Sequence, residues 1–128
     1  MKRLTILLAT MGLMLALSTG VAMAVVLAGT RDDDFLKGTG VTDRFYGLSG
    51  EDRLWGLAGD DVLYGGDDED KINGGVGRDF LSGGRDEDII VADDNRKDII
   101  NCGLDEDIAF VDAGLDRVSS NCERVVNR

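Results

Sequence analysis

Apolar side chains recur every nine residues through the middle of this 128-residue chain. The series consists of Leu36, Phe45, Leu54, Leu63, Ile72, Leu81 and Ile90. Each of these residues predicts the centre of a three-residue β-strand, in which the middle side chain points inward and its two neighbours point outward. Two such nonapeptides make a flattened coil of about 18 residues, and successive coils stack at about 4.8 Å, the spacing of strands in a sheet. The pattern therefore predicts an all-β, parallel β-solenoid with two repeats per coil.

Glycine and aspartate share this period. A glycine opens each nonapeptide, from Gly29 to Gly83, and an aspartate follows five residues later, two residues before the apolar position. Each repeat therefore consists of a six-residue turn, positions 1 to 6, and a three-residue strand. Glycines at turn positions 1, 2 and 4 permit positive φ and let backbone carbonyl groups crowd toward a bound ion.

The segment Gly74–Ser82 fits the pattern G-G-x-G-x-D-x-U-x, with U apolar, at every defined position; this pattern marks a calcium-binding parallel β-helix repeat. The chain thus resembles the RTX, or haemolysin-type, calcium-binding repeat family. The resemblance implies a right-handed parallel β-roll, here of about ten nonapeptides. It also implies calcium between turns n and n+2 on the same edge, with the position 6 aspartate as the side-chain ligand. Because Ca²⁺ takes six to eight oxygens, turn carbonyl groups would complete each shell.

The candidate side-chain ligands are Asp34, Asp43, Asp52, Asp61, Asp70, Asp79 and Asp88. The candidate turn residues that contribute backbone oxygens are Gly47, Gly50, Gly56, Gly59, Gly65, Gly66, Gly74, Gly75, Gly77, Gly83 and Gly84. Position 4 is Asp32 in the first repeat and Val41 in the second, where a left-handed conformation is costly for a β-branched residue. We therefore expect the best-formed sites within residues 47–91, while seven turns in all frame up to five sites.

After Val91 the period slips by one residue and then resumes at Asp98, Asp107 and Asp116 with few glycines, so we do not expect Asp107 or Asp116 to bind calcium. Cys102 and Cys122 are separated along the chain by little more than one coil, and are expected to form a disulfide on adjacent coils of an exported protein. Two free buried thiols are the alternative. The stretch around these cysteines also resembles the ends of small secreted bacterial proteins of this repeat type.

The N-terminus has the features of a signal peptide at residues 1–24. Lys2 and Arg3 precede an uncharged apolar run that ends in a small-x-small site at Ala22–Ala24. An uncleaved membrane anchor is the alternative, because the uncharged run is long enough to span a bilayer. Residues 25–91 would then form the calcium-binding repeats, and residues 92–128 a degenerate, disulfide-linked cap.

Charge excludes several partners. Without residues 1–24, 12 basic and 25 acidic side chains remain, a net charge of −13. Such a surface argues against nucleic acid or anionic membrane as a partner. One inward hydrophobic residue per repeat also gives a thin core, and small domains of this kind usually need metals or disulfides to fold. We therefore expect calcium to be required for folding.

The sequence favours a non-enzymatic, secreted calcium-binding protein. The chain has no histidine, which excludes a Ser-His-Asp triad and the usual catalytic zinc sites. A carboxylate pair of the glycosidase type stays open among 25 acidic residues. The alternative function is an extracellular adhesion or matrix module that uses calcium only for stability. Its contact patch would be Tyr46, Tyr64 and Phe80, which face outward at about one coil apart.

Overall fold

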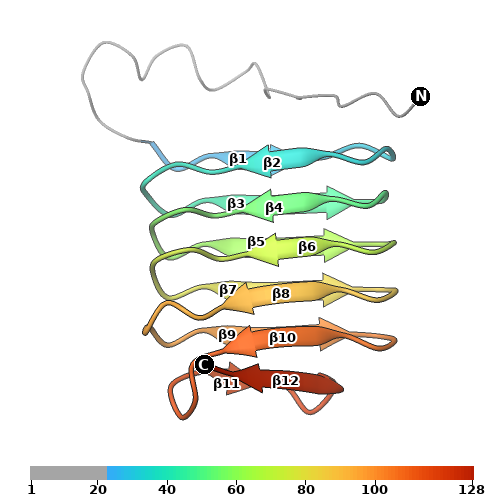
Figure 1. Cartoon of the computed structure of the whole chain (residues 1–128). Coiled ribbons are helices and arrows are strands. Elements are labelled where there is room, and N and C mark those ends of the chain that lie inside the picture. Colours follow the sequence, from blue (N-terminus) through green and yellow to red (C-terminus); the bar gives the residue numbers. More distant parts are fainter. Residues whose placement is uncertain (1–22) are drawn as a thin grey trace.

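The structure, a computed structural model, describes residues 23–128, so residues 1–22 of the predicted signal peptide lie outside the described part of the chain. The described part contains twelve β-strands and no helix, and hence no helix that could cross a membrane. The strands form two parallel six-stranded sheets, and consecutive strands alternate between them. The chain therefore winds through six stacked coils (Figure 1).

The first sheet contains, in spatial order, β1 (Val26–Ala28), β3 (Arg44–Leu48), β5 (Val62–Gly66), β7 (Phe80–Gly84), β9 (Ile99–Gly103) and β11 (Arg117–Val118). The second contains β2 (Phe35–Lys37), β4 (Arg53–Trp55), β6 (Lys71–Asn73), β8 (Ile89–Ala92), β10 (Ile108–Val111) and β12 (Arg124–Asn127). The predicted all-β, parallel solenoid is confirmed. It is longer than the expected ten repeats, because β1 precedes the first Gly–Asp turn and β12 follows Glu123 where an aspartate would stand.

The register between strands follows the sequence period. Phe45 pairs with Leu63, and Leu36 pairs with Leu54, so each residue meets its equivalent two repeats further along the chain. Leu81 pairs with Ile100, which lies one position beyond two full repeats, so the slip after Val91 is accommodated in the loop of residues 93–98. The last coil is shorter, since Ala109 pairs with Val125, which comes before two full repeats are complete.

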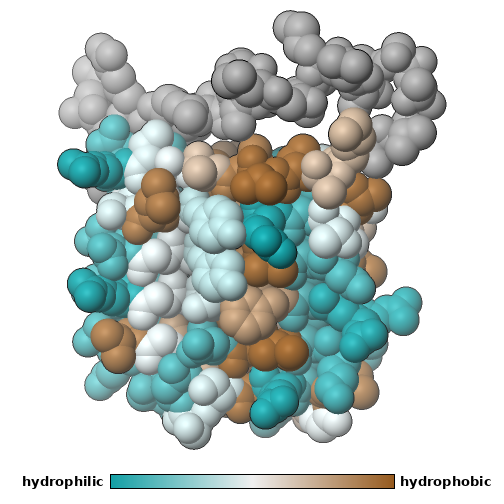
Figure 2. Space-filling model, turned by 180° about the vertical axis from the view of Figure 1, so that it is seen from behind, coloured by the Kyte–Doolittle hydropathy of each residue, from teal (hydrophilic) through white to brown (hydrophobic). Residues whose placement is uncertain are grey.

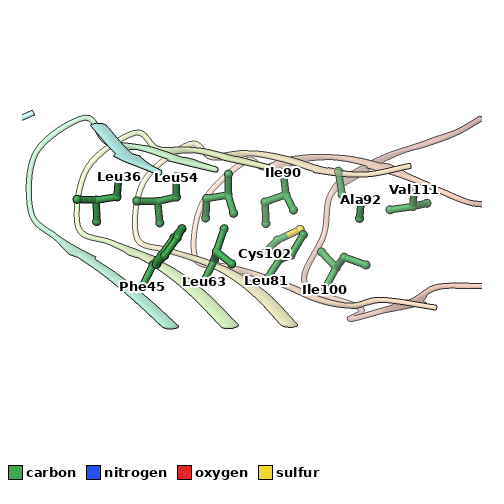
Figure 3. Close-up of a cluster of buried hydrophobic side chains, with 12 residues drawn as sticks. Leu36, Phe45, Leu54, Leu63, Leu81, Ile90, Ala92, Ile100, Cys102 and Val111 are labelled. Carbon is green, nitrogen blue, oxygen red and sulfur yellow. The ribbon is translucent and has the colours of Figure 1, made fainter. Parts of the chain in front are cut away.

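The core is two facing rows of side chains, one from each sheet (Figure 3). Its members are at most 2% exposed, and they include every residue of the nine-residue apolar series. Towards the C-terminus Ala92, Cys102 and Val111 add further buried side chains at the end of their strands, where the regular repeats have glycine. The last coils therefore have a thicker core than the regular repeats. Each additional buried aliphatic side chain stabilises the fold by on the order of 1.5–3 kcal/mol.

Candidate functional site

The position 6 aspartates lie buried along the two edges of the roll. We number the turns from Gly29–Asp34 (first) and Gly38–Asp43 (second) to Cys102–Asp107 (ninth) and Val111–Asp116 (tenth). Asp34, Asp43, Asp52, Asp61, Asp70, Asp79, Asp88, Asp98 and Asp107 are all 2% exposed or less. Odd-numbered turns stack on one edge and even-numbered turns on the other, so each edge carries a column of buried carboxylates. A buried charge is costly unless a hydrogen-bond donor or a cation compensates it.

One oxygen of each carboxylate accepts a hydrogen bond from the neighbouring coil, except in Asp34, whose Oδ1 has no partner among the described residues. The backbone amide of Asp52 donates to Asp70 Oδ1 at 2.8 Å, and the amide of Asp70 donates to Asp88 Oδ1 at 2.8 Å. The same bond recurs along both columns. At the end of one column, the amide of Asp107 donates to Glu123 Oε2 at 3.1 Å. Glu123 thus takes the aspartate's position in the last coil. It was not among the residues expected from the sequence, because the pattern was followed through aspartates only, although Glu123 also stands two residues before an apolar side chain, Val125.

The second oxygen of most of these carboxylates has no partner. Among the described residues, no hydrogen bond reaches the buried Oδ2 atoms of Asp52, Asp61, Asp70, Asp79, Asp88, Asp98 and Asp107. Leaving a charged acceptor unsatisfied is expensive, and native structures rarely do so without an ion, a water or a functional reason. Seven repetitions of the same unpaired atom mark these turns as the candidate site.

Glycine at position 1 is required by close packing. A Cβ atom on Gly65 would collide with Asp70 Oδ2 and with the carbonyl oxygen of Gly83 on the next coil. The positive φ that glycine permits is not used at this position, because none of the position 1 glycines has it. The missing side chain instead lets two oxygens, a carboxylate and a carbonyl, come close to the same backbone atom.

Left-handed residues occur at positions 2 and 4 of the turns. In the fifth turn Gly66 has φ of 123° and Asp68 has φ of 76°. The third, fourth, sixth and seventh turns share this double left-handed pattern, even though Leu48 and Leu57 must adopt it without being glycine. Aspartate tolerates this region better than most residues, which explains its use at position 4.

Burial raises the pKa of the stacked carboxyl groups well above 3.8. Desolvation is the largest cause, the backbone hydrogen bond opposes it, and neighbouring carboxylates raise the values further. The pKa rises to about 7 for Asp52, Asp61 and Asp70, to about 6 for Asp79, and to about 8 for Asp88 and Asp98. Without a cation these columns therefore hold their negative charge at a considerable cost near neutral pH.

The donor set fits a hard cation. Carboxylate and carbonyl oxygens are the ligands that Ca²⁺ prefers, and both kinds of oxygen meet beside most position 1 glycines, for example Gly65. Within residues 23–128, no three acidic or cysteine side chains converge on one point. A bound ion would therefore combine one or two aspartates with several main-chain oxygens, as the sequence pattern predicts.

Cys102 and Cys122 form the expected disulfide, with an S–S distance of 2.01 Å and a Cα–Cα distance of 5.1 Å. Cys102 lies at the end of β9 and is fully buried in the core, whereas Cys122 lies in the loop before β12. The disulfide therefore links the last coil, β11 and β12, to the preceding coil, β9 and β10.

Comparison with known proteins identifies the repeats. A family model described as "RTX calcium-binding nonapeptide repeat (4 copies)" matches residues 37–72, 46–81 and 64–96. These overlapping matches contain six of the buried aspartates, from Asp43 to Asp88. A comparison with curated proteins found no match. Residues 37–96 of this chain thus match the RTX calcium-binding nonapeptide repeat family.

Proposed function

We propose that this protein is an exported, non-enzymatic calcium-binding protein whose roll folds when calcium binds between stacked turns. The observation that carries the proposal is the set of seven buried Oδ2 atoms that accept no hydrogen bond in the described chain. Together with main-chain oxygens of the glycine-rich turns, these atoms would hold the ions. Bound calcium supplies the positive charge that the columns of carboxylates lack.

Charge and core size explain why folding would depend on the ion. The chain has a net charge of −13 without residues 1–24, and the regular repeats bury one hydrophobic side chain each. Ions that bind only the folded state stabilise it by mass action. Export, with cleavage of a signal peptide at residues 1–24, would bring the protein into the calcium-rich medium that such binding requires.

Circular dichroism of residues 25–128 tests the proposal. We expect little sheet signal in a chelator at neutral pH and a cooperative rise in sheet at roughly 0.1–1 mM calcium, the range typical of extracellular modules. Magnesium at the same concentration is the control, because it demands six near-octahedral ligands at shorter distances and gives up its water reluctantly. Equal sheet content in chelator and in calcium would refute calcium-coupled folding.

One observation favours the alternative, an adhesion or matrix module. Tyr46 and Tyr64 stack on the outer face of the first sheet with ring centroids 5.4 Å apart and an interplanar angle of 6°, and Phe80 lies 5.7 Å further along. Figure 2 shows a face of the molecule where neutral and hydrophobic side chains gather in the middle, between more hydrophilic edges. In that case calcium would serve only the fold, and binding would depend on the tyrosines.

A further inference from the structure

The first two turns treat their aspartates differently from the turns that follow. Asp34 Oδ2 accepts hydrogen bonds from the backbone amide of Thr30 at 2.5 Å and from its hydroxyl at 2.9 Å. Asp43 Oδ2 accepts the same pair of bonds from Thr39, at 2.6 Å and 2.9 Å. Both threonines stand at turn position 2. In these two turns, therefore, the oxygen that is unpaired in the third to ninth turns has two donors from its own turn.

The backbone of these turns differs in the same way. Neither the first nor the second turn contains a residue with positive φ, whereas the third to seventh turns have one at both position 2 and position 4. Threonine is β-branched and disfavours the left-handed region. We attribute the change in backbone to this preference, which leaves the amide and the hydroxyl of residue 2 within reach of the carboxylate four residues later.

The ninth turn has the opposite character to the first two. Cys102 replaces the position 1 glycine, but Gly103 has φ of 111° and Asp105 has φ of 80°, close to the 124° and 69° of Gly84 and Asp86 in the seventh turn. Asp107 is 1% exposed. Its Oδ1 accepts the amide of Asp88 at 2.8 Å, and its Oδ2 has no partner.

The tenth turn closes the series. Asp116 Oδ2 accepts a hydrogen bond from the amide of Asp112, four residues earlier, at 2.8 Å. Carboxylates whose two oxygens both have donors thus stand at both ends of the roll, in the second and tenth turns. The turns with an unpaired Oδ2 form one continuous run from the third to the ninth.

We propose that calcium binds along the third to ninth turns, with Asp107 as a ligand, and that the first two turns form a metal-independent cap in which Thr30 and Thr39 replace the ion. This inference rests on the proposed calcium-binding function. It removes Asp34 and Asp43 from the predicted ligands and adds a turn that the sequence pattern set aside.

The test compares single Asp→Asn variants by their calcium midpoint for folding and by their thermal midpoint in saturating calcium. Asp70→Asn is the reference, since Asp70 lies inside the run, with a turn of the run on each side of it along its own edge. We expect Asp70→Asn and Asp107→Asn each to raise the calcium midpoint several-fold and to recover full sheet signal at higher calcium, because added ion compensates for a weakened ligand. Asp43→Asn should keep the calcium midpoint within twofold, while its thermal midpoint falls and more calcium does not restore it.

A matched threonine pair tests the cap directly. Thr39→Val removes the hydroxyl that donates to Asp43, and Thr42→Val alters an exposed threonine in the same turn. Thr39→Val should lower the thermal midpoint in saturating calcium and leave the calcium midpoint unchanged, and Thr42→Val should change neither.

Two results would overturn the inference. One is a calcium midpoint for Asp43→Asn raised as much as that for Asp70→Asn. The other is an Asp107→Asn variant whose midpoint is unchanged, or whose sheet signal no concentration of calcium restores. A wild-type protein that does not respond to calcium would instead refute the proposed function.

Discussion

At the scale of single residues, the position 1 glycine and the position 6 aspartate depend on each other. The carboxylate is buried against the glycine, and its Oδ2 lies where a Cβ atom would clash. The two lie five positions apart in the same turn, and the turn brings them into contact. The glycine is thus required by the space its side chain would fill, and the left-handed conformations belong to positions 2 and 4.

Gly65→Ala tests this packing. The new Cβ would strike Asp70 Oδ2, on a buried side chain held by the amide of Asp52, and the main-chain carbonyl oxygen of Gly83. We expect a loss of about 1–3 kcal/mol in the free energy of unfolding, measured by urea denaturation in saturating calcium, as for other overpacked sites.

Gly40→Ala is the matched control for this substitution. Gly40 has no atom within 4 Å of the new Cβ and no positive φ. The change should be neutral or stabilise the protein by about 0.4–1 kcal/mol, since alanine restricts the unfolded chain. Equal losses from the two substitutions would show that close packing at Gly65 is unimportant.

At the scale of elements, the two sheets and the two ends of the roll differ. Strands β3, β5, β7 and β9 run for five residues and continue the register through Leu48, Gly66, Gly84 and Gly103, whereas β2, β4 and β6 have three residues. The third, fifth, seventh and ninth turns, which contain these four residues, therefore continue the register of the first sheet. At the C-terminus β11 has only two residues and β12 is largely exposed, so the last coil has little packing of its own.

The disulfide should compensate for this weak last coil. The bond closes a loop of about 20 residues, which corresponds to about 3 kcal/mol in the chain-entropy model. We expect Cys102→Ala with Cys122→Ala to speed backbone hydrogen exchange mainly in residues 117–127, and to leave the calcium midpoint of the repeats nearly unchanged. Two titratable thiols in the exported, calcium-loaded protein would contradict the role of the bond.

At the scale of the whole molecule, the protein combines two columns of buried carboxylates with a strongly acidic surface. Six aspartates have a pKa of about 6 to 8 in the fold, against 3.8 for an exposed aspartate. Since the fold raises these pKa values, it favours the protonated form. The contribution of these protonated carboxyl groups to the stability of the metal-free roll is then fully present below about pH 4 and is lost as the pH rises through 6 to 8.

Thermal unfolding of the metal-free protein at pH 5 and pH 8 tests this dependence. We expect a higher midpoint at pH 5 and a weak or absent transition at pH 8. Saturating calcium should narrow or reverse the difference, because the ion binds the charged carboxylates and its contribution grows as they lose their protons. A metal-free roll that is more stable at pH 8 than at pH 5 would contradict the raised pKa values.

The sequence by itself determined the class of fold, the register and the aspartate columns. A single period carries the inward hydrophobic residue, the turn glycine and the carboxylate, and stacking coils of two repeats each brings equal positions together. The one-residue slip after Val91 was also readable, because the same period resumes beyond it. Glu123 and β12 were missed, since a shorter last coil and a glutamate fall outside the pattern.

Only the tertiary structure decided which carboxylate oxygens have donors. The donor to Asp70 Oδ1 is the amide of Asp52 on the neighbouring coil, and whether Oδ2 is also satisfied depends on the backbone conformation of the turn. The sequence alone includes Asp43 among the candidate ligands, although it places the best-formed sites within residues 47–91, and it discounts Asp107. In three dimensions both donors of Thr39 bind Asp43 Oδ2, whereas Asp107 has the same surroundings as Asp88. The ninth turn resembles the seventh because both have left-handed residues at positions 2 and 4, although the ninth contains fewer glycines.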